Sequence, residues 1–195
     1  ISGFTPLTET LFQYHHQGAE VLSALLGEVF GEMVCQVYAR QGFIPMFAGD
    51  GFFAVFPGAA AETAEHAWQT AVSIQKHFRS ARGPFSIYVT PYGNFEIGVK
   101  IGIAVGEVDW GILYSDHQAI CYFRGDALYD CADAEQTAVT GEIIAHDTLL
   151  THLSSQYEAW SADVPAFHKI VPLSAIPCAP DKLPPLALPP QLTAV

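Results

Sequence analysis

Apolar residues recur at helical spacing over residues 19–38, and this pattern predicts an amphipathic helix. We expect Gly42 to end that helix, because glycine commonly follows the last helical turn. A shorter helix is expected to begin in the segment FTPLTE, where Thr5 can act as the N-cap and Pro6 suits the first helical position. Apolar positions that include Trp68, Val72 and Ile74 predict another helix over residues 59–82.

Two short apolar runs, FIPMF and GFFAVF, are joined at residues 48–51, and this combination predicts a β-hairpin. Pro45 cannot donate to a ladder, so the first strand should lie at an edge or carry an irregularity. The segment PYGNFEIG is rich in turn residues and is predicted to be a turn. The remaining pattern predicts strands over 99–114 and 117–123, a helix over 125–139, a strand over 141–146, a short helix over 147–153 and a last strand over 167–173.

The order of these elements favours an α/β sandwich, in which helices cover a mixed or antiparallel sheet mainly on one face. One domain is expected over residues 1–173, since half of the 195 residues are hydrophobic and can form a sizeable core. Residues 174–195 are rich in proline and nearly free of charge. We expect them to form a linker or tail of polyproline II character.

Charge is sparse and one-sided, with eight Lys and Arg against twenty Asp and Glu and a net charge of −12. An acidic surface repels nucleic acid and anionic membranes, which argues against both as main partners. No apolar run reaches the roughly eighteen residues that span a bilayer, so no membrane insertion is expected. The four cysteines form no CxxC pair, which is typical of free thiols in a reducing compartment and predicts a cytoplasmic location.

Asp50 lies in the middle of the apolar stretch FAGDGFFAVF. A buried carboxylate without a partner is costly, so this side chain must sit in a turn, be paired, or hold a cation. On these letters alone, the neighbouring glycines favour a plain turn residue. The other segments of the chain change that balance.

Five segments, ISGFTPLTE, FAGDGFFAVF, VKIGIAVGEV, RGDALYDCADA and GEIIAH, occur in the order and at the spacing of class III nucleotidyl cyclase domains. The chain resembles this family over residues 1–150, and most resembles the first cyclase domain of soluble adenylyl cyclase-like multidomain proteins. The resemblance implies a ferredoxin-like βαββαβ core and head-to-tail pairing with a second cyclase domain. It also implies conversion of ATP to cyclic AMP and pyrophosphate, with Mg²⁺ or Mn²⁺ in the complete site.

The resemblance assigns metal binding to two aspartates, and Asp50 matches the second of them. The first is expected directly before Ile1, so we expect the chain to be truncated at its N-terminus. The backbone carbonyl of Ile1 is also expected to bind a metal. Rigidly held carboxylate oxygens suit a hard cation such as Mg²⁺, and Gly49 leaves room beside it.

The resemblance also implies a triphosphate site. The backbone amides of Gly3, Phe4 and Thr5 are expected to face the phosphates at the mouth of a helix, where N–H groups and the dipole favour anions. Gly49 is also expected at the nucleotide site, and Lys100 is expected to act as a point cation for the triphosphate. The alternatives are that Thr5 is a plain N-cap and that Lys100 is a solvated lysine at the end of a strand.

Four family positions are degenerate. Met46 stands at the purine-selecting position and Tyr122 at the second base-reading position, while Tyr129 and Asp133 replace an asparagine and an arginine that stabilise the transition state. An aspartate in place of that arginine reverses the charge aimed at the reacting phosphate, which should raise the barrier by several kcal/mol. The two tyrosines fit better as interface residues.

The resemblance therefore implies the metal-bearing half of an asymmetric adenylyl cyclase, inactive as a homodimer and completed by a second cyclase domain of the same chain or of a dimer partner. The alternative is a catalytically dead pseudo-cyclase kept for dimerisation or nucleotide sensing. A sensor of the same topology without a cyclase history is a third, weaker interpretation. In soluble adenylyl cyclases a related pocket binds bicarbonate through a lysine and an arginine, and Met46 and Ala132 at those positions argue against bicarbonate sensing here.

Overall fold

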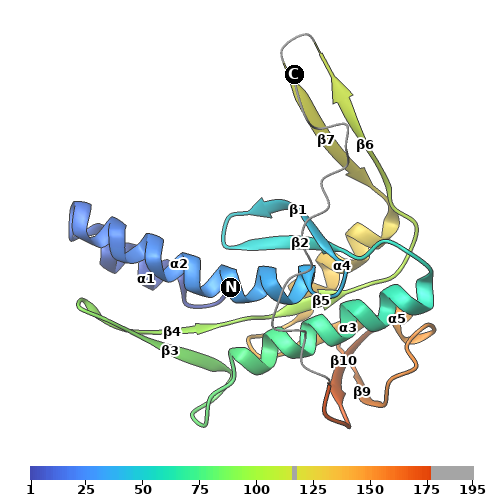
Figure 1. Ribbon diagram of the computed structural model, residues 1–195. Helices are drawn as coiled ribbons and strands as arrows, with labels where there is room; N and C mark the ends of the chain where they lie inside the picture. The colour runs from blue at the N-terminus through green and yellow to red at the C-terminus, as the bar shows by residue number, and fades with distance from the viewer. Residues whose placement is uncertain (116–117, 177–195) are drawn as a thin grey trace.

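The computed structural model describes residues 1–115 and 118–176 and forms a mixed α/β fold (Figure 1). The helices are α1 (Phe4–Phe12), α2 (His15–Tyr38), α3 (Ala60–His77), α4 (Asp126–Thr137) and α5 (Asp147–Leu150). The strands are β1 (Phe43–Ala48), β2 (Gly51–Val55), β3 (Phe85–Thr90), β4 (Gly93–Gly98), β5 (Ile101–Ile103), β6 (Asp109–Tyr114), β7 (Ala119–Arg124), β8 (Ile143–His146), β9 (Tyr157–Ser161) and β10 (Phe167–Pro172).

The described strands form four separate sheets. Three are two-stranded antiparallel hairpins, β1–β2, β3–β4 and β6–β7, and the fourth has the order β5-β8-β10-β9. In the four-stranded sheet, β5 pairs with β8 in parallel and the other pairs are antiparallel. The sheet is therefore mixed, as the order of elements predicted.

The predicted hairpin around Asp50 is confirmed, with Ala48 paired to Gly51. The irregularity expected at Pro45 is also present, because the register shifts between Phe43 and Met46. The segment PYGNFEIG was wrongly predicted to be a turn, since most of it is β4, paired along its whole length with β3. The pattern also missed β3 and β9. The tail predicted over residues 174–195 lies largely outside the described residues.

The predicted helix boundaries need three corrections. Helix α1 has Gly3 as its N-cap, without a side-chain cap, so Thr5 lies inside the first turn and Pro6 at the third helical position. Helix α2 ends at Tyr38, so Gly42 lies four residues beyond its last residue. The Gly42 N–H donates to the Val37 carbonyl. Helix α3 ends at His77, five residues before the predicted end.

Three hydrophobic clusters flank the described strands, two that include residues of α1, α2 or α3 and a third that includes α4. In the first, Leu11 of α1 and Val29 of α2 pack with Ile97 of β4. In the second, Trp68 of α3 packs with Ile143 of β8. Neighbouring residues of a strand face opposite sides of the sheet. Ile144, the next residue of β8, therefore faces the opposite side, where it packs with Ala134 of α4.

Helix α2 is an exception to the expectation that no apolar stretch is long enough to span a bilayer. Among the described residues it is the one helix that is long and apolar enough to cross a membrane, by length and composition alone. Its buried residues include Leu25, Val29 and Met33, which belong to the core. The helix therefore has a structural reason to be apolar that requires no bilayer.

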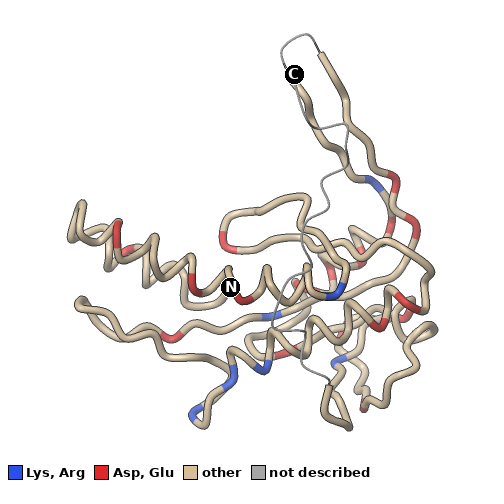
Figure 2. Tube along the Cα trace, in the orientation of Figure 1, with Lys and Arg blue, Asp and Glu red and all other residues tan. Residues whose placement is uncertain are grey.

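The β6–β7 hairpin projects from the body as an arm (Figure 1). Its side chains are unusually apolar for such an exposed element. The exposed large hydrophobics on it are Trp110, Ile112, Leu113, Tyr114, Ile120 and Tyr122. Within the described part of the arm, charge is confined to its base, at Asp109 and Arg124 (Figure 2). Exposed apolar patches of this kind are typical of protein interaction sites.

Candidate functional site

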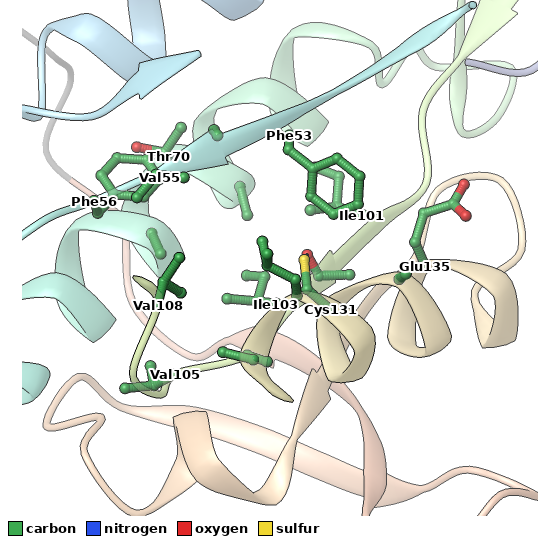
Figure 3. A pocket seen from close by; sticks show the side chains of 18 of the residues that line it. Phe53, Val55, Phe56, Thr70, Ile101, Ile103, Val105, Val108, Cys131 and Glu135 are labelled. Carbon is green, nitrogen blue, oxygen red and sulfur yellow. The ribbon is translucent and has the colours of Figure 1, made fainter. Parts of the chain in front are cut away.

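A cleft of about 1160 Å³ lies between β2, β5, α3 and α4. Its walls are mostly apolar, and the side chains of Phe53, Ile101 and Cys131 point toward it from three different elements (Figure 3). Charged groups on its lining include Asp50, Lys100 and Glu135. An apolar cleft with a few converging polar groups is the usual form of a binding site.

Asp50 sits in the tight turn between β1 and β2, next to Gly49, which adopts φ 62°. This left-handed conformation is easy for glycine and gives the turn its shape. The Asp50 side chain is 47% exposed, so the charge in the apolar run is not buried. The turn leaves the carboxylate accessible to solvent, and Asp50 also lines the cleft.

Ile1 lies directly against Asp50. Its amino group donates to the Asp50 backbone carbonyl at 3.1 Å and lies 3.8 Å from the Asp50 Oδ2 atom. Both residues line the cleft. The structure therefore brings together the two residues predicted to bind metal, although they are far apart in the chain.

The predicted phosphate-binding residues are only partly gathered at the cleft. Lys100 lines it, whereas Gly3, Phe4, Thr5 and Gly49 are absent from its lining. Gly3 adopts φ 87° and packs so closely on β4 that a Cβ atom there would overlap the Glu96 carbonyl oxygen. The N-terminus of α1 is thus fixed beside β4, close to Ile1 but outside the cleft.

Lys100 is held by an ion pair that the sequence did not reveal. Its Nζ lies 3.2 Å from Oε1 of Glu135 on α4, and the lysine side chain is 29% exposed. A phosphate ligand would therefore compete with this carboxylate for the lysine. Glu135 could not be found from spacing, because it is 35 residues away and arrives through the packing of α4 on β5.

The four degenerate positions all lie outside the cleft. Met46, Tyr122 and Tyr129 are exposed by 53%, 43% and 69%, and Asp133 is on the exposed side of α4. Surface exposure agrees with the interpretation of the two tyrosines as interface residues.

The described residues contain no group of three or more His, Cys, Asp or Glu side chains that could hold a metal ion. Asp50 and the Ile1 carbonyl offer oxygen ligands, which suit Mg²⁺ or Mn²⁺ in kind. One carboxylate and one carbonyl are too few for either ion without further ligands. The remaining ligands would have to come from other chain segments, water or a nucleotide.

Cys131 is a residue of the cleft that the sequence did not single out. Burial, together with the smaller effects of the Glu135 and Asp130 carboxylates, raises the pKa of its thiol to about 11. The thiol also donates to the Gly102 carbonyl at 3.3 Å. Since the thiolate is the reactive form, Cys131 should be a slow nucleophile.

We expect a thiol reagent at pH 8 to label Cys131 about 100-fold more slowly than Cys35 and Cys121, because both of these are exposed. Pulse labelling followed by peptide mapping measures the three rates separately. Raising the pH should accelerate labelling of Cys131 up to about pH 11. Equal rates at the three sites would contradict the burial of this thiol.

No family model and no curated protein matches the chain. Solved structures do match. The guanylyl cyclase Cya2 is 20% identical, with a TM-score of 0.62 and coverage of 89% of both chains. The adenylyl cyclase CyaB from P. aeruginosa is 19% identical, with a TM-score of 0.58 and coverage of 87% of both chains. The catalytic core of a rhodopsin-guanylyl cyclase in complex with ATPalphaS is 16% identical, with a TM-score of 0.58, covering 75% of this chain and 80% of that chain.

These similarities show the fold of the chain. It is the mixed α/β fold of adenylyl and guanylyl cyclase catalytic domains, which the five sequence segments implied. The chain thus has the fold of a cyclase domain. At these identities the comparisons speak for the fold, and the chemistry has to be argued from the residues of the cleft.

Proposed function

We propose that this domain is the metal-bearing half of an asymmetric adenylyl cyclase, completed by a second cyclase domain. The observation that carries the proposal is the contact between Ile1 and Asp50 at the mouth of the cleft. It supports the proposal because Ile1, from a distant segment, lies beside Asp50, with the Ile1 nitrogen 3.8 Å from the Asp50 Oδ2 atom. A metal bound there would have Lys100 on the same cleft lining.

Each residue then has a defined task. The metal ions, when bound, would activate the ribose 3′-hydroxyl and neutralise the triphosphate. Asp50 and the Ile1 carbonyl would hold the metal, and the tight turn keeps the carboxylate in place. Lys100 would exchange Glu135 for a phosphate oxygen. The low number of cations in the chain makes this lysine the main positive charge available to the nucleotide from this half.

The partner would supply what this half lacks. Met46 cannot make the polar contacts that select a purine, Tyr122 stands at the second base-reading position, and Asp133 would repel the developing negative charge of the reacting phosphate. Two copies of this chain would therefore form two sites without base-reading and transition-state groups. The exposed apolar surface of the β6–β7 arm supports a partner domain, since such a surface is normally covered.

The second candidate function is a pseudo-cyclase that dimerises or senses nucleotides without turnover. The Lys100–Glu135 ion pair favours it, because the lysine is already neutralised. In this case nucleotide would bind weakly and the metal ligands would remain incomplete. The two functions differ in one measurable property, the formation of product.

The test is complementation. The chain is mixed with a cyclase domain that carries the purine-selecting lysine and the transition-state asparagine and arginine, and cyclic AMP is measured with ATP and Mg²⁺ or Mn²⁺. We expect no product from either domain alone and at least about 100-fold more from the mixture, as is typical for restoring transition-state charge contacts. If sedimentation detects a mixed dimer but the dimer makes no cyclic AMP, the pseudo-cyclase is favoured.

A further inference from the structure

Positive charge gathers where α3 ends. Lysine and arginine positions lie close together at the end of this helix and in the loop that follows it (Figure 2). A pocket of about 480 Å³ in this region is lined by Arg79, Arg82 and Lys169, together with one carboxylate, Glu142. It shares no lining residue with the large cleft. Like charges repel, so this grouping in a chain of net charge −12 calls for a physical reason.

The dipole of α3 explains only part of the grouping. Lys76 belongs to the last turn of the helix, where a cation interacts favourably with the free carbonyl groups. This effect falls off beyond the last turn. Arg82 lies in the loop after the helix, and Lys169 belongs to β10, so neither of them stabilises the end of α3 in this way.

The loop that carries the arginines has a fixed backbone. Ser80 and Gly83 exchange two backbone hydrogen bonds, of 3.0 and 3.3 Å, which close a tight turn with Arg82 inside it. The Ser80 Oγ atom also accepts a hydrogen bond from the Arg82 N–H at 3.2 Å. Because this backbone is already ordered, a ligand of Arg82 loses less conformational entropy on binding.

Pro84 packs the loop against the opposite wall of the pocket. Gly141 adopts φ 85°, and a Cβ atom there would overlap the Cβ atom of Pro84. This close approach brings the loop beside residues 140–142, which line the pocket together with it. Three segments that are distant in the chain therefore build the pocket: the loop after α3, residues 140–142, and β10.

The charges of the pocket are only partly neutralised. The Lys169 Nζ atom lies 2.7 Å from Oε1 of Glu142. The side chains of Arg79 and Arg82, in contrast, have no hydrogen bond or ion pair with any residue that the structure describes. Two guanidinium groups thus remain to receive an anion, and the planar fork of arginine matches the oxygens of a phosphate group.

We propose that this pocket binds a small compound through a phosphate group, with Arg79 and Arg82 donating hydrogen bonds to the phosphate oxygens. The Ser80 hydroxyl, which accepts from the Arg82 N–H, keeps its own proton to donate to the same group. Lys169 adds positive charge at the opposite wall. The proposal does not depend on cyclase activity.

The size and charge of the pocket favour a small phosphate compound over other anions. Its volume of about 480 Å³ falls within the few hundred to about 1000 Å³ that are typical of small-molecule sites. Two unpaired arginines match the two negative charges of a phosphate group, whereas a carboxylate carries one. An anionic lipid surface is disfavoured, because it would also meet the acidic remainder of the protein.

The experiment is a titration of the full chain, labelled with ¹⁵N, with inorganic phosphate in the absence of divalent metal. We expect the amide signals of Gly83 and Gly141 to shift, and that of Gly102 in the large cleft to stay in place. Arg82→Ala should weaken binding at least about tenfold, because charge-assisted hydrogen bonds are lost. A parallel titration with adenosine monophosphate distinguishes a free phosphate ion from an esterified one, since the source that fits the pocket binds more tightly.

Lys76→Ala is the matched control. Lys76 is an exposed cation of the same surface that does not line the pocket. Its loss should change the affinity for phosphate by less than about twofold, since only long-range attraction is reduced. Equal weakening by Lys76→Ala and Arg82→Ala would overturn the proposal in favour of a diffuse positive surface. Binding to phosphorylated peptides or anionic vesicles, without any response to either small phosphate compound, would overturn it as well.

Discussion

Replacing Asp50 by asparagine should lower cyclic AMP formation in the complemented dimer by about 100- to 1000-fold, while leaving the fold intact. The change removes the charge of the one carboxylate at the apex of the hairpin. Asparagine fits the same turn and keeps the Asp50 backbone carbonyl that accepts the Ile1 hydrogen bond. The loss would therefore come from metal binding, measured as steady-state activity over a range of Mn²⁺ concentrations.

Asp163→Asn is the matched control. Asp163 is an exposed aspartate that does not line the cleft, so its loss removes the same charge from elsewhere on the surface. This variant should retain full activity. Raising the Mn²⁺ concentration should partly rescue Asp50→Asn, because a weaker ligand set can be filled by mass action. Activity within twofold of the parent for Asp50→Asn would remove Asp50 from the metal site.

The hairpin at Asp50 could be predicted because its signals are local. The glycines on both sides of Asp50, two short apolar runs and Pro45 are all visible within a few residues of the sequence. The β3–β4 hairpin was missed for the opposite reason. Pro91, Gly93 and Asn94 lie together, yet Gly93 and Asn94 are paired within β4, so pairing with β3 overrides their turn preference.

The charge environment of the cleft could not be predicted, because it is set by long-range packing. Lys100 is visible in the sequence, but the carboxylate that neutralises it is carried by α4. The same applies to Cys131, whose raised pKa follows from its burial against β5. Both depend on how closely α4 approaches the sheet, and that distance is set by one residue of β5.

That residue is Gly102, and we expect Gly102→Ala to destabilise the protein by about 3 kcal/mol. A Cβ atom at this position would overlap the backbone nitrogen of Glu135 and the backbone oxygen of Cys131. Neither is the flexible end of a side chain, so relief requires α4 to move away from β5. The cost should lower the melting temperature by about 10 °C, measured by circular dichroism.

Gly27→Ala is the control, because Gly27 is exposed in α2 and a Cβ atom there would meet nothing within 4 Å. It should stabilise the protein by about 0.5–1 kcal/mol through the higher helix propensity of alanine. Displacement of α4 in Gly102→Ala should also expose Cys131 and accelerate its labelling, which a general loss of propensity would not do. Similar melting temperatures for the two variants would show that α4 does not need the space left by Gly102, and the position of Glu135 beside Lys100 would then require another explanation.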